Sequence, residues 1–347
     1  MLNRFRITAA AAALACLSGT ASAQAVITNG TLRMGINQFG DLNTGSVAQV
    51  TGTRTVGLRL ITPAGDYEST ADGCTCEGWG VGVRTAGVVG AWGGSNSSVG
   101  GVTNLTSVSF TSTASTATST VRLTAGAALT VQHLYRPSSI PNMYEVQVTI
   151  TNTGATSIGD VVYRRVMDWD ISPTQFNENV RISGWGATNL IGSGSNGFLS
   201  ARPLDVAGGC IIGGACNANF ETTVGADRGS FFDFSFGVLG AGESKVFQTF
   251  YGAAPTYSAL LTALGAVGAE VYTAAWCAGG APGATPTSCN GKNGPAVFGY
   301  GFRGVGGAPP PELPPAPGVV PEPSTYALMG TGLMGLAMYS RRRRTNA

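Results

Sequence analysis

The sequence predicts an all-β fold: an antiparallel β-sandwich with one short helix, large enough to be supersandwich-like. Short runs that alternate apolar and polar residues recur along the chain, and turn-forming residues separate them. Glycine is abundant, at 52 of 347 residues, but it follows no strict triplet period, which excludes a collagen-like chain. Hydrophobic residues make up 43% of the chain, which is too many for general disorder.

The first 23 residues are predicted to be a secretory signal peptide. Arg4 and Arg6 precede an apolar run over residues 7–17, and Ala21-Ser22-Ala23 has the A-x-A form of a signal-peptidase site. Cleavage after Ala25 would fit the pattern as well. We therefore expect signal peptidase to process the precursor and the protein to be exported. A β-sandwich region, as one large or two small domains, would then occupy residues 24–307.

The clearest strand is MYEVQVTITN, residues 143–152. Alternate side chains of a strand point to opposite faces, so its apolar and polar residues would separate. The apolar face would carry Tyr144, Val146, Val148 and Ile150, and the polar face Glu145, Gln147, Thr149 and Thr151. The Asn152-Thr153-Gly154 segment would form a turn, and residues 161–171 a returning strand.

The stretch SFTSTASTATSTVRLTAG is rich in Ser and Thr, which raises ice binding as a third, remote function. An ice-matching surface would need hydroxyl residues at a constant spacing on a flat sheet. Phe110 and Val121 interrupt the series, and no fixed period is present. We therefore predict a solvent-facing pair of strands.

One helix is predicted over residues 256–273. Leu260, Leu261, Leu264 and Val267 recur at helical spacing, and Thr256 or Ser258 can cap the start. A final strand in PAVFGYGFRGVGG follows. Residues 308–320 are rich in proline and are predicted to be an extended linker.

Six cysteines remain after the signal peptide, which contains Cys16, is removed. An even number of cysteines in an exported protein favours disulfides, although six allow 15 connectivities. Proximity favours pairing of Cys210 with Cys216, of Cys277 with Cys289, and of Cys74 with Cys76 in a small ring. A zinc site is the alternative, but the spacing is wrong for it and no histidine is nearby.

The segment YRRVMDWDISPTQFNE is the best candidate for chemistry. On a strand, Asp168 and Asp170 share a face with Cβ atoms about 7 Å apart, a separation compatible with paired carboxylates in glycoside hydrolysis. Glu178 is the third candidate acid. The same acids with Asn177 could bind Ca²⁺ through oxygen. The structural interpretation is a solvated strand face or an ion pair with Arg164.

The opposite face of this strand would be apolar, with Met167 and Trp169 in the core. Arg165 would share that face, so a buried acid must pair with it or it must lie near a strand end. His133 is the one histidine, which excludes a His-rich metal site, and no G-x-S-x-G motif is present for a Ser-His-Asp triad. Trp79 and Trp185 in Gly-rich loops would either stack on sugars or plug the loops.

The chain ends in three ordered parts: Pro321-Glu322-Pro323, an apolar run over residues 324–340, and the arginines Arg341, Arg342, Arg343 and Arg344. As a helix the apolar run would span about 25 Å, which is short for a stable transmembrane anchor. This order resembles the PEP-CTERM sorting signal of Gram-negative bacteria, and residues 321–347 form the segment. Similar segments have also been labelled ice-binding protein C-terminal motifs.

The resemblance implies processing by an exosortase, a membrane enzyme that removes the helix near the Pro-Glu-Pro, and a link to exopolysaccharide or biofilm. The other pieces EVQVTITNTG, YRRVMDWDISPT, GAVGAEVY and FGYGFRGVGG resemble an uncharacterised group of exported bacterial proteins and imply no activity. Six of the 20 basic residues lie in the two signals, which leaves 14 basic against 18 acidic residues. The mature net charge of −4 disfavours nucleic acid as a partner.

We therefore expect a non-enzymatic structural or adhesion protein without a cofactor, held in the membrane as a precursor and then placed at the cell surface or in the extracellular matrix. Extracellular polysaccharide would be its partner there, and the membrane only a transient one. The alternative is a secreted polysaccharide-active enzyme that uses Asp168, Asp170 or Glu178.

Overall fold

A computed structural model describes residues 24–44, 55–206, 215–278 and 289–309. Contacts between Cα atoms divide the chain into Met1–Pro310 and Pro311–Ala347, and only the first unit contains described residues. The predicted signal peptide, most of the Pro-rich linker and the C-terminal sorting segment lie outside the described residues.

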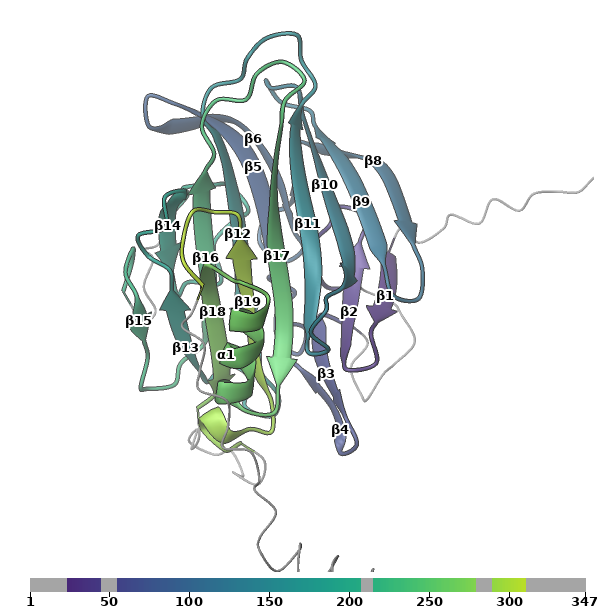
Figure 1. Cartoon of the computed structure of the whole chain (residues 1–347), viewed down its shortest axis with the longest axis vertical. Helices are drawn as coiled ribbons and strands as arrows, with labels where there is room; N and C mark the ends of the chain where they lie inside the picture. Colours follow the sequence, from purple (N-terminus) through teal and green to yellow (C-terminus); the bar gives the residue numbers. More distant parts are fainter. Residues whose placement is uncertain (1–23, 45–54, 207–214, 279–288, 310–347) are drawn as a thin grey trace, which may run out of the picture. The chain divides into compact units, whose positions relative to one another are not determined.

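The largest sheet has nine antiparallel strands and forms one layer of a β-sandwich (Figure 1). Its strand order is β15-β13-β18-β19-β17-β11-β10-β9-β8. In that order the strands are Phe220–Glu221, Glu178–Ser183, Val271–Cys277, Val297–Arg303, Ser244–Ala254, Met143–Asn152, Leu129–Pro137, Ala117–Leu123 and Leu105–Ser112.

The second layer is a six-stranded antiparallel sheet in the order β14-β16-β12-β5-β6-β7. Its strands are Leu190–Gly194, Arg228–Ser235, Val161–Trp169, Gly78–Thr85, Val88–Asn96 and Gly101–Thr103. A four-stranded sheet, β1-β2-β3-β4, comprises Gln24–Thr28, Leu32–Asn37, Leu58–Thr62 and Gly65–Glu68. The predicted all-β antiparallel sandwich is thus confirmed.

Strand β11 follows the alternation that the sequence predicts. Its apolar residues Tyr144, Val146, Val148 and Ile150 are buried in the core between the sheets, and the polar residues between them are partly exposed. This match follows from geometry, because one face of the sheet meets the core and the other meets solvent.

The segment after β11 does not form the predicted hairpin. Strand β12 belongs to the six-stranded sheet, where it pairs with β5 and β16, whereas β11 pairs with β10 and β17. The turn at Asn152 is therefore a crossing from one layer to the other. The side chain of Asn152 holds this corner, because its amide nitrogen donates to the carbonyls of Thr156, Leu239 and Gly240.

All nine residues of β12 are buried. One face points into the main core with Tyr163, Met167 and Trp169. The segment after β14 covers the other face: Leu199 packs against Val166, and the Arg164 guanidinium donates to the carbonyls of Ser200 and Asp205. A strand covered on both sides must place its charged residues out of water.

Helix α1 spans Tyr257–Ala266 and packs on the outer side of the nine-stranded sheet, against β17, β18 and β19 (Figure 1). Thr256 caps it, with the side-chain oxygen accepting from the Ala259 amide. The helix is shorter than predicted, because Gly268 adopts a positive φ directly after it and the chain enters β18 at Val271. A short 3-10 helix at Gly291–Asn293 precedes β19.

The Ser- and Thr-rich stretch forms β8 and β9 at the edge of the nine-stranded sheet. Most residues of β8 are exposed or partly exposed, whereas β9 buries alternate residues. The hydroxyl-rich edge strand thus faces solvent, as the sequence predicts.

Candidate acidic site

Three strand ends bring four acids of distant sequence together. Asp168 lies near the end of β12 and Asp170 directly follows that strand. On β16, Gly229 pairs with Asp168 and Arg228 with Trp169, so Asp227 comes next to the end of β12. Glu178 begins β13, and its backbone bridges to Ala226 beside Asp227. The strand register therefore assembles the site.

The acids of this site are buried, which corrects the expectation of a solvated strand face. Asp168 is 1% exposed, and Asp170 and Glu178 are each 0% exposed. Nor do the two aspartates pair with Arg164. The Arg164 guanidinium forms a bidentate ion pair with Asp233, with nitrogen–oxygen distances of 2.8 and 2.6 Å. Asp227 is the one partly exposed acid of the group.

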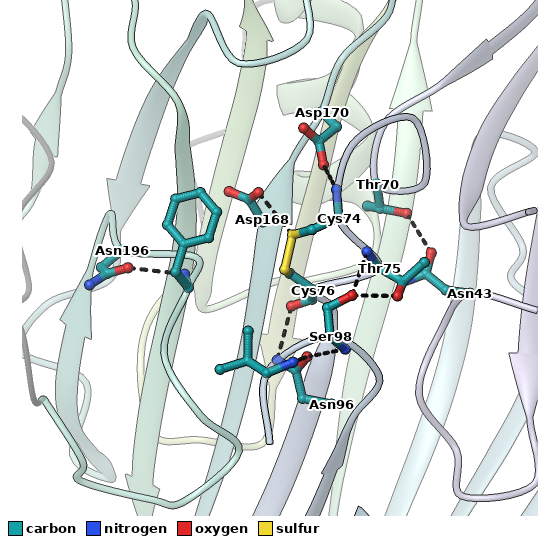
Figure 2. The surroundings of a disulfide bond; sticks show 12 residues. Asn43, Thr70, Cys74, Thr75, Cys76, Asn96, Ser98, Asp168, Asp170 and Asn196 are labelled. Carbon is teal, nitrogen blue, oxygen red and sulfur yellow. Dashed lines mark hydrogen bonds between the residues drawn. A yellow bond between two sulfur atoms is a disulfide. The ribbon is translucent and has the colours of Figure 1, made fainter. Parts of the chain in front are cut away.

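The loop that contains Cys74 closes over the two aspartates (Figure 2). The Cys74 amide donates to Asp170 Oδ2 at 3.1 Å, and the Cys74 Sγ lies 3.3 Å from Asp168 Oδ2. Cys74 is joined to Cys76, and a disulfide sulfur carries no proton. Asp168 must therefore be protonated and act as the donor for the sulfur contact to be a hydrogen bond.

Two glycines allow the chain to approach these carboxylates closely. A Cβ atom on Gly73 would lie 2.2 Å from Asp170 Oδ1, and one on Gly197 would lie 2.8 Å from Asp168 Oδ1. Only a residue without a side chain fits at either position. Gly73 thus borders the site at Asp170, and Gly197 borders it at Asp168.

Each of the four acids keeps an oxygen without a hydrogen-bond partner. These oxygens are Oδ1 of Asp168, Asp170 and Asp227, and Oε2 of Glu178. The other oxygen of Glu178 accepts the Ile171 amide at 3.2 Å. Buried polar atoms of folded proteins usually have partners, so four unpartnered carboxylate oxygens in one place are unusual.

Burial raises the pKa of every acid in the site, and repulsion by neighbouring acids adds to the effect at Asp168, Asp170 and Glu178. Burial raises the pKa of Asp168 to about 9, and the charges of Asp170 and Asp227 contribute. Burial, with the charge of Asp227, raises the pKa of Asp170 to about 7, although the Cys74 amide acts in the opposite direction. Burial raises the pKa of Glu178 to about 10, against the effect of the Ile171 amide. The pKa of Asp227 is also raised by burial.

This geometry suits the binding of a small cation better than the hydrolysis of a polymer. A glycosidase needs both carboxyl groups in contact with the sugar, and Asp168 and Glu178 are closed off from solvent. One oxygen from each of Asp168, Asp170 and Asp227 lies within 4.8 Å of the others. Asn177 from the predicted Ca²⁺ set points elsewhere, since its side-chain nitrogen donates to the Ala278 carbonyl.

The other predicted cysteines lie apart from this site. Cys277, at the end of β18, is joined to Cys289, with their Cα atoms 6.1 Å apart. Cys216 is disulfide-bonded, and Cys210 lies outside the described residues. In the described part of the chain the sulfurs of Cys74 and Cys76 are tied to each other, so they offer no thiolate to a zinc ion.

The remaining sequence candidates belong to the core or the surface. His133 is buried, and its Nε2 lies 3.2 Å from the Tyr163 hydroxyl. Trp79 is buried and donates from Nε1 to the Phe39 carbonyl, so it is a core residue. Trp185 is 36% exposed.

The sequence alone missed two acids of these buried groups. Glu77 lies 2.5 Å from Arg165 Nε and is fully buried, so it supplies the acid partner that Arg165 was predicted to need. Its signal was the position two residues before Trp79, directly ahead of the Gly-rich strand β5. Asp227 carries no local signal, because only the register between β12 and β16 places it beside Asp170.

Comparison with known proteins identifies one segment of the chain. The family model of the PEP-CTERM protein-sorting motif matches residues 319–344. The chain therefore carries a PEP-CTERM sorting motif, as the sequence predicted, which makes it an exported protein with a membrane-anchored precursor and processing by an exosortase. No helix among the described residues is long and apolar enough to cross a membrane. The predicted sorting helix lies outside those residues.

No curated protein matches the sequence at a significant level. Two solved structures are similar over most of their length. One is a candidate aldose 1-epimerase from Escherichia coli K12, at 9% identity, 81% coverage of this chain, 98% of that chain and a TM-score of 0.28. The other is a galactose mutarotase related enzyme from Lactobacillus acidophilus, at 7% identity, 83% and 99% coverage and a TM-score of 0.27. Likeness at this level carries no argument about activity.

Proposed function

We propose that this protein is a non-enzymatic component of the extracellular polysaccharide matrix, delivered by its PEP-CTERM motif and acting there as a structural or adhesion protein. The observation that carries the proposal is the motif itself, which gives an exported β-sandwich an exosortase-dependent route. Cell surface or matrix is the destination that we propose for the released domain.

The burial of the best acids supports binding rather than catalysis. A polysaccharide chain would have to reach Asp168, Asp170 and Glu178, which are all at most 1% exposed. By contrast, three aromatic side chains offer ring surface to solvent: Phe176 at 55%, Phe198 at 37% and Trp185 at 36% exposure. Exposed rings can stack on sugar faces without any acid, which suits an adhesion protein.

The sorting step is tested by replacing Glu322 in the Pro-Glu-Pro triplet with alanine. We expect the variant to remain in the membrane fraction at its precursor mass, because the exosortase would lose its recognition sequence. Glu312→Ala in the Pro-rich linker is the matched control, since it removes the same side chain outside the triplet. Normal release of Glu322→Ala would contradict the proposed route.

Matrix binding is tested with the exopolysaccharide of the producing cells. We expect the released protein to sediment with the polysaccharide and to liberate no reducing ends. Trp185→Ala should weaken sedimentation if the exposed ring contacts sugar, while Trp276→Ala, at a 4% exposed ring, should not change it in protein that remains folded. Sustained release of reducing ends would contradict a non-enzymatic role.

The alternative function is a polysaccharide-active enzyme, and the raised pKa values of Asp168 and Glu178 favour it. A carboxylic acid with its pKa near 9 or 10 stays protonated at neutral pH and could act as a general acid. Turnover by the wild type that is lost in Asp168→Asn would support this alternative. Binding without turnover in both proteins would support the matrix function.

A further inference from the structure

We propose that Asp168, Asp170 and Asp227 bind one Ca²⁺ ion, and that this ion stabilises the β-sandwich once the protein is outside the cell. The proposal does not depend on the matrix function. It concerns a structural cation at the junction of β12, β13 and β16.

The distances between the three carboxylates fit a single ion of this size. Ca²⁺ holds its oxygen ligands at about 2.3–2.6 Å, so two ligands of one ion lie at most about 5 Å apart. One oxygen from each of Asp168, Asp170 and Asp227 lies within 4.8 Å of the other two. The three oxygens can therefore contact one ion without a change in the fold.

The chemistry of the donors selects a hard cation. All three ligands are carboxylates, and the neighbouring sulfurs of Cys74 and Cys76 are joined in a disulfide. Oxygen-only sites suit Ca²⁺ and Mg²⁺, whereas zinc and copper sites use sulfur or imidazole. Ca²⁺ accepts irregular geometry more readily than Mg²⁺, which demands a near-ideal octahedron.

Buried carboxylate oxygens without hydrogen bonds are a second, independent indication that a cation binds here. Glu178 is 0% exposed, its Oε2 has no hydrogen-bond partner, and the charges of both Asp170 and Asp168 act on it. The Oδ1 atoms of Asp168 and Asp170 are also buried and unpartnered. Glu178 can therefore supply a fourth oxygen, directly or through water.

Basic residues do not neutralise this group of acids in the described part of the chain. No ion pair joins Asp168, Asp170, Asp227 or Glu178 to a lysine or arginine there. Arg228 lies next to the site and acts electrostatically on Glu178, but its Nη1 donates to the carbonyls of Glu178 and Val224. Buried carboxylates without a counter-charge are costly, and a divalent cation would offset that cost.

The site has a route for the ion and a rigid frame. Asp227 is partly exposed, so an ion can enter from solvent at that ligand. The backbone at Gly73 packs closely against Asp170, and that at Gly197 against Asp168, which limits the movement of both carboxylates. Sites in extracellular modules typically bind Ca²⁺ with a Kd of about 0.1–1 mM. A site of that affinity would fill after export.

The test uses the full chain, purified in detergent, stripped with EDTA and dialysed free of the chelator. Addition of 10 mM Ca²⁺ should raise the Tm by about 3–8 °C, as expected for a ligand at roughly 10 to 100 times its Kd. Isothermal titration should give one Ca²⁺ per chain. The same concentration of Mg²⁺ should raise the Tm by less than a third as much.

Asp227→Asn is the informative variant, because this residue is partly exposed and its replacement should leave the fold intact. We expect it to lose most of the Ca²⁺-induced rise in Tm. Asp66→Asn is the matched control, an aspartate of strand β4 that pairs with Arg33 and is not one of the four acids, and it should keep the full rise. An equal response to Mg²⁺, no heat of Ca²⁺ binding, or a full rise in Tm for Asp227→Asn would each overturn the proposal.

Discussion

The centre and the C-terminal end of strand β12 treat buried charge in opposite ways. In the centre, Arg165 meets Glu77 at 2.5 Å and Arg164 meets Asp233 at 2.6 Å, and all four side chains are at most 1% exposed. At the C-terminal end, Asp168 and Asp170 are equally buried but have no basic partner among the described residues. The same strand thus carries a compensated and an uncompensated group of charges.

The compensated centre of β12 depends on hydrogen bonds as well as on charge. Glu77 accepts from the Tyr251 hydroxyl at 2.8 Å and from the Leu42 amide at 2.6 Å. The Arg165 guanidinium also contacts the hydroxyls of Tyr135 and Tyr163 at 3.3 Å. Residues from both sheets converge on one ion pair, so its partners fix how the layers pack. The acidic end has no comparable set of basic and hydrogen-bonding partners among the described residues, and a bound cation would supply the missing positive charge.

The largest expected effect comes from breaking the buried ion pair at the compensated centre of β12. Arg165→Met should lower the free energy of unfolding by about 3–5 kcal/mol, because Glu77 would remain buried without its partner. Denaturant titration measures the change. Arg136→Met is the control, since the Arg136–Glu145 pair is exposed at the arginine and should contribute less than about 1 kcal/mol. Equal losses in the two variants would show that the buried pair has no special role.

A second pair of variants makes the same change, Asp to Asn, at the two places, and we expect opposite effects on the stability of the protein. Asp233→Asn should destabilise the protein by about 2–3 kcal/mol, because it leaves Arg164 buried with a weaker partner. Asp170→Asn, measured in EDTA, should instead raise stability by about 1 kcal/mol, because it removes repulsion with Asp227. Denaturant midpoints at pH 8 compare them. If both variants lose stability, the acidic end is compensated in some other way.

Patterns of neighbouring residues predicted much of the fold, whereas the residues of the site are brought together by the pairing of strands that are distant in sequence. The alternation of β11, the Thr256 cap and the need of Arg165 for a buried acid could all be inferred from neighbouring residues. The pairing of β12 with β5 and β16 could not, because the Asn152 turn fits a hairpin as well as a crossing between sheets. That pairing brings Glu77 to Arg165 and Asp227 to Asp170.

The smallest expected effect tests whether His133, beside the compensated centre of β12, stays unprotonated in the folded protein. Burial, and then the charge of Arg165, hold the pKa of His133 well below its ordinary value of 6.5. Below pH 6.5 the unfolded chain takes up a proton that the folded protein refuses. The stability contributed by neutral His133 is therefore complete above that pH and falls as the pH drops toward the folded pKa.

His133→Gln should remove this dependence while keeping a group that can bond to the Tyr163 hydroxyl. Between pH 6.5 and 5.5, the wild type should lose up to about 1 kcal/mol more stability than the variant. The difference between the two proteins isolates His133, because the acids near Asp168 titrate in both. Parallel pH profiles would mean that His133 is protonated in the folded state, and so that the network around Arg165 tolerates a second positive charge. That result would weaken the contrast between the centre and the C-terminal end of β12, since both would then hold unbalanced charge.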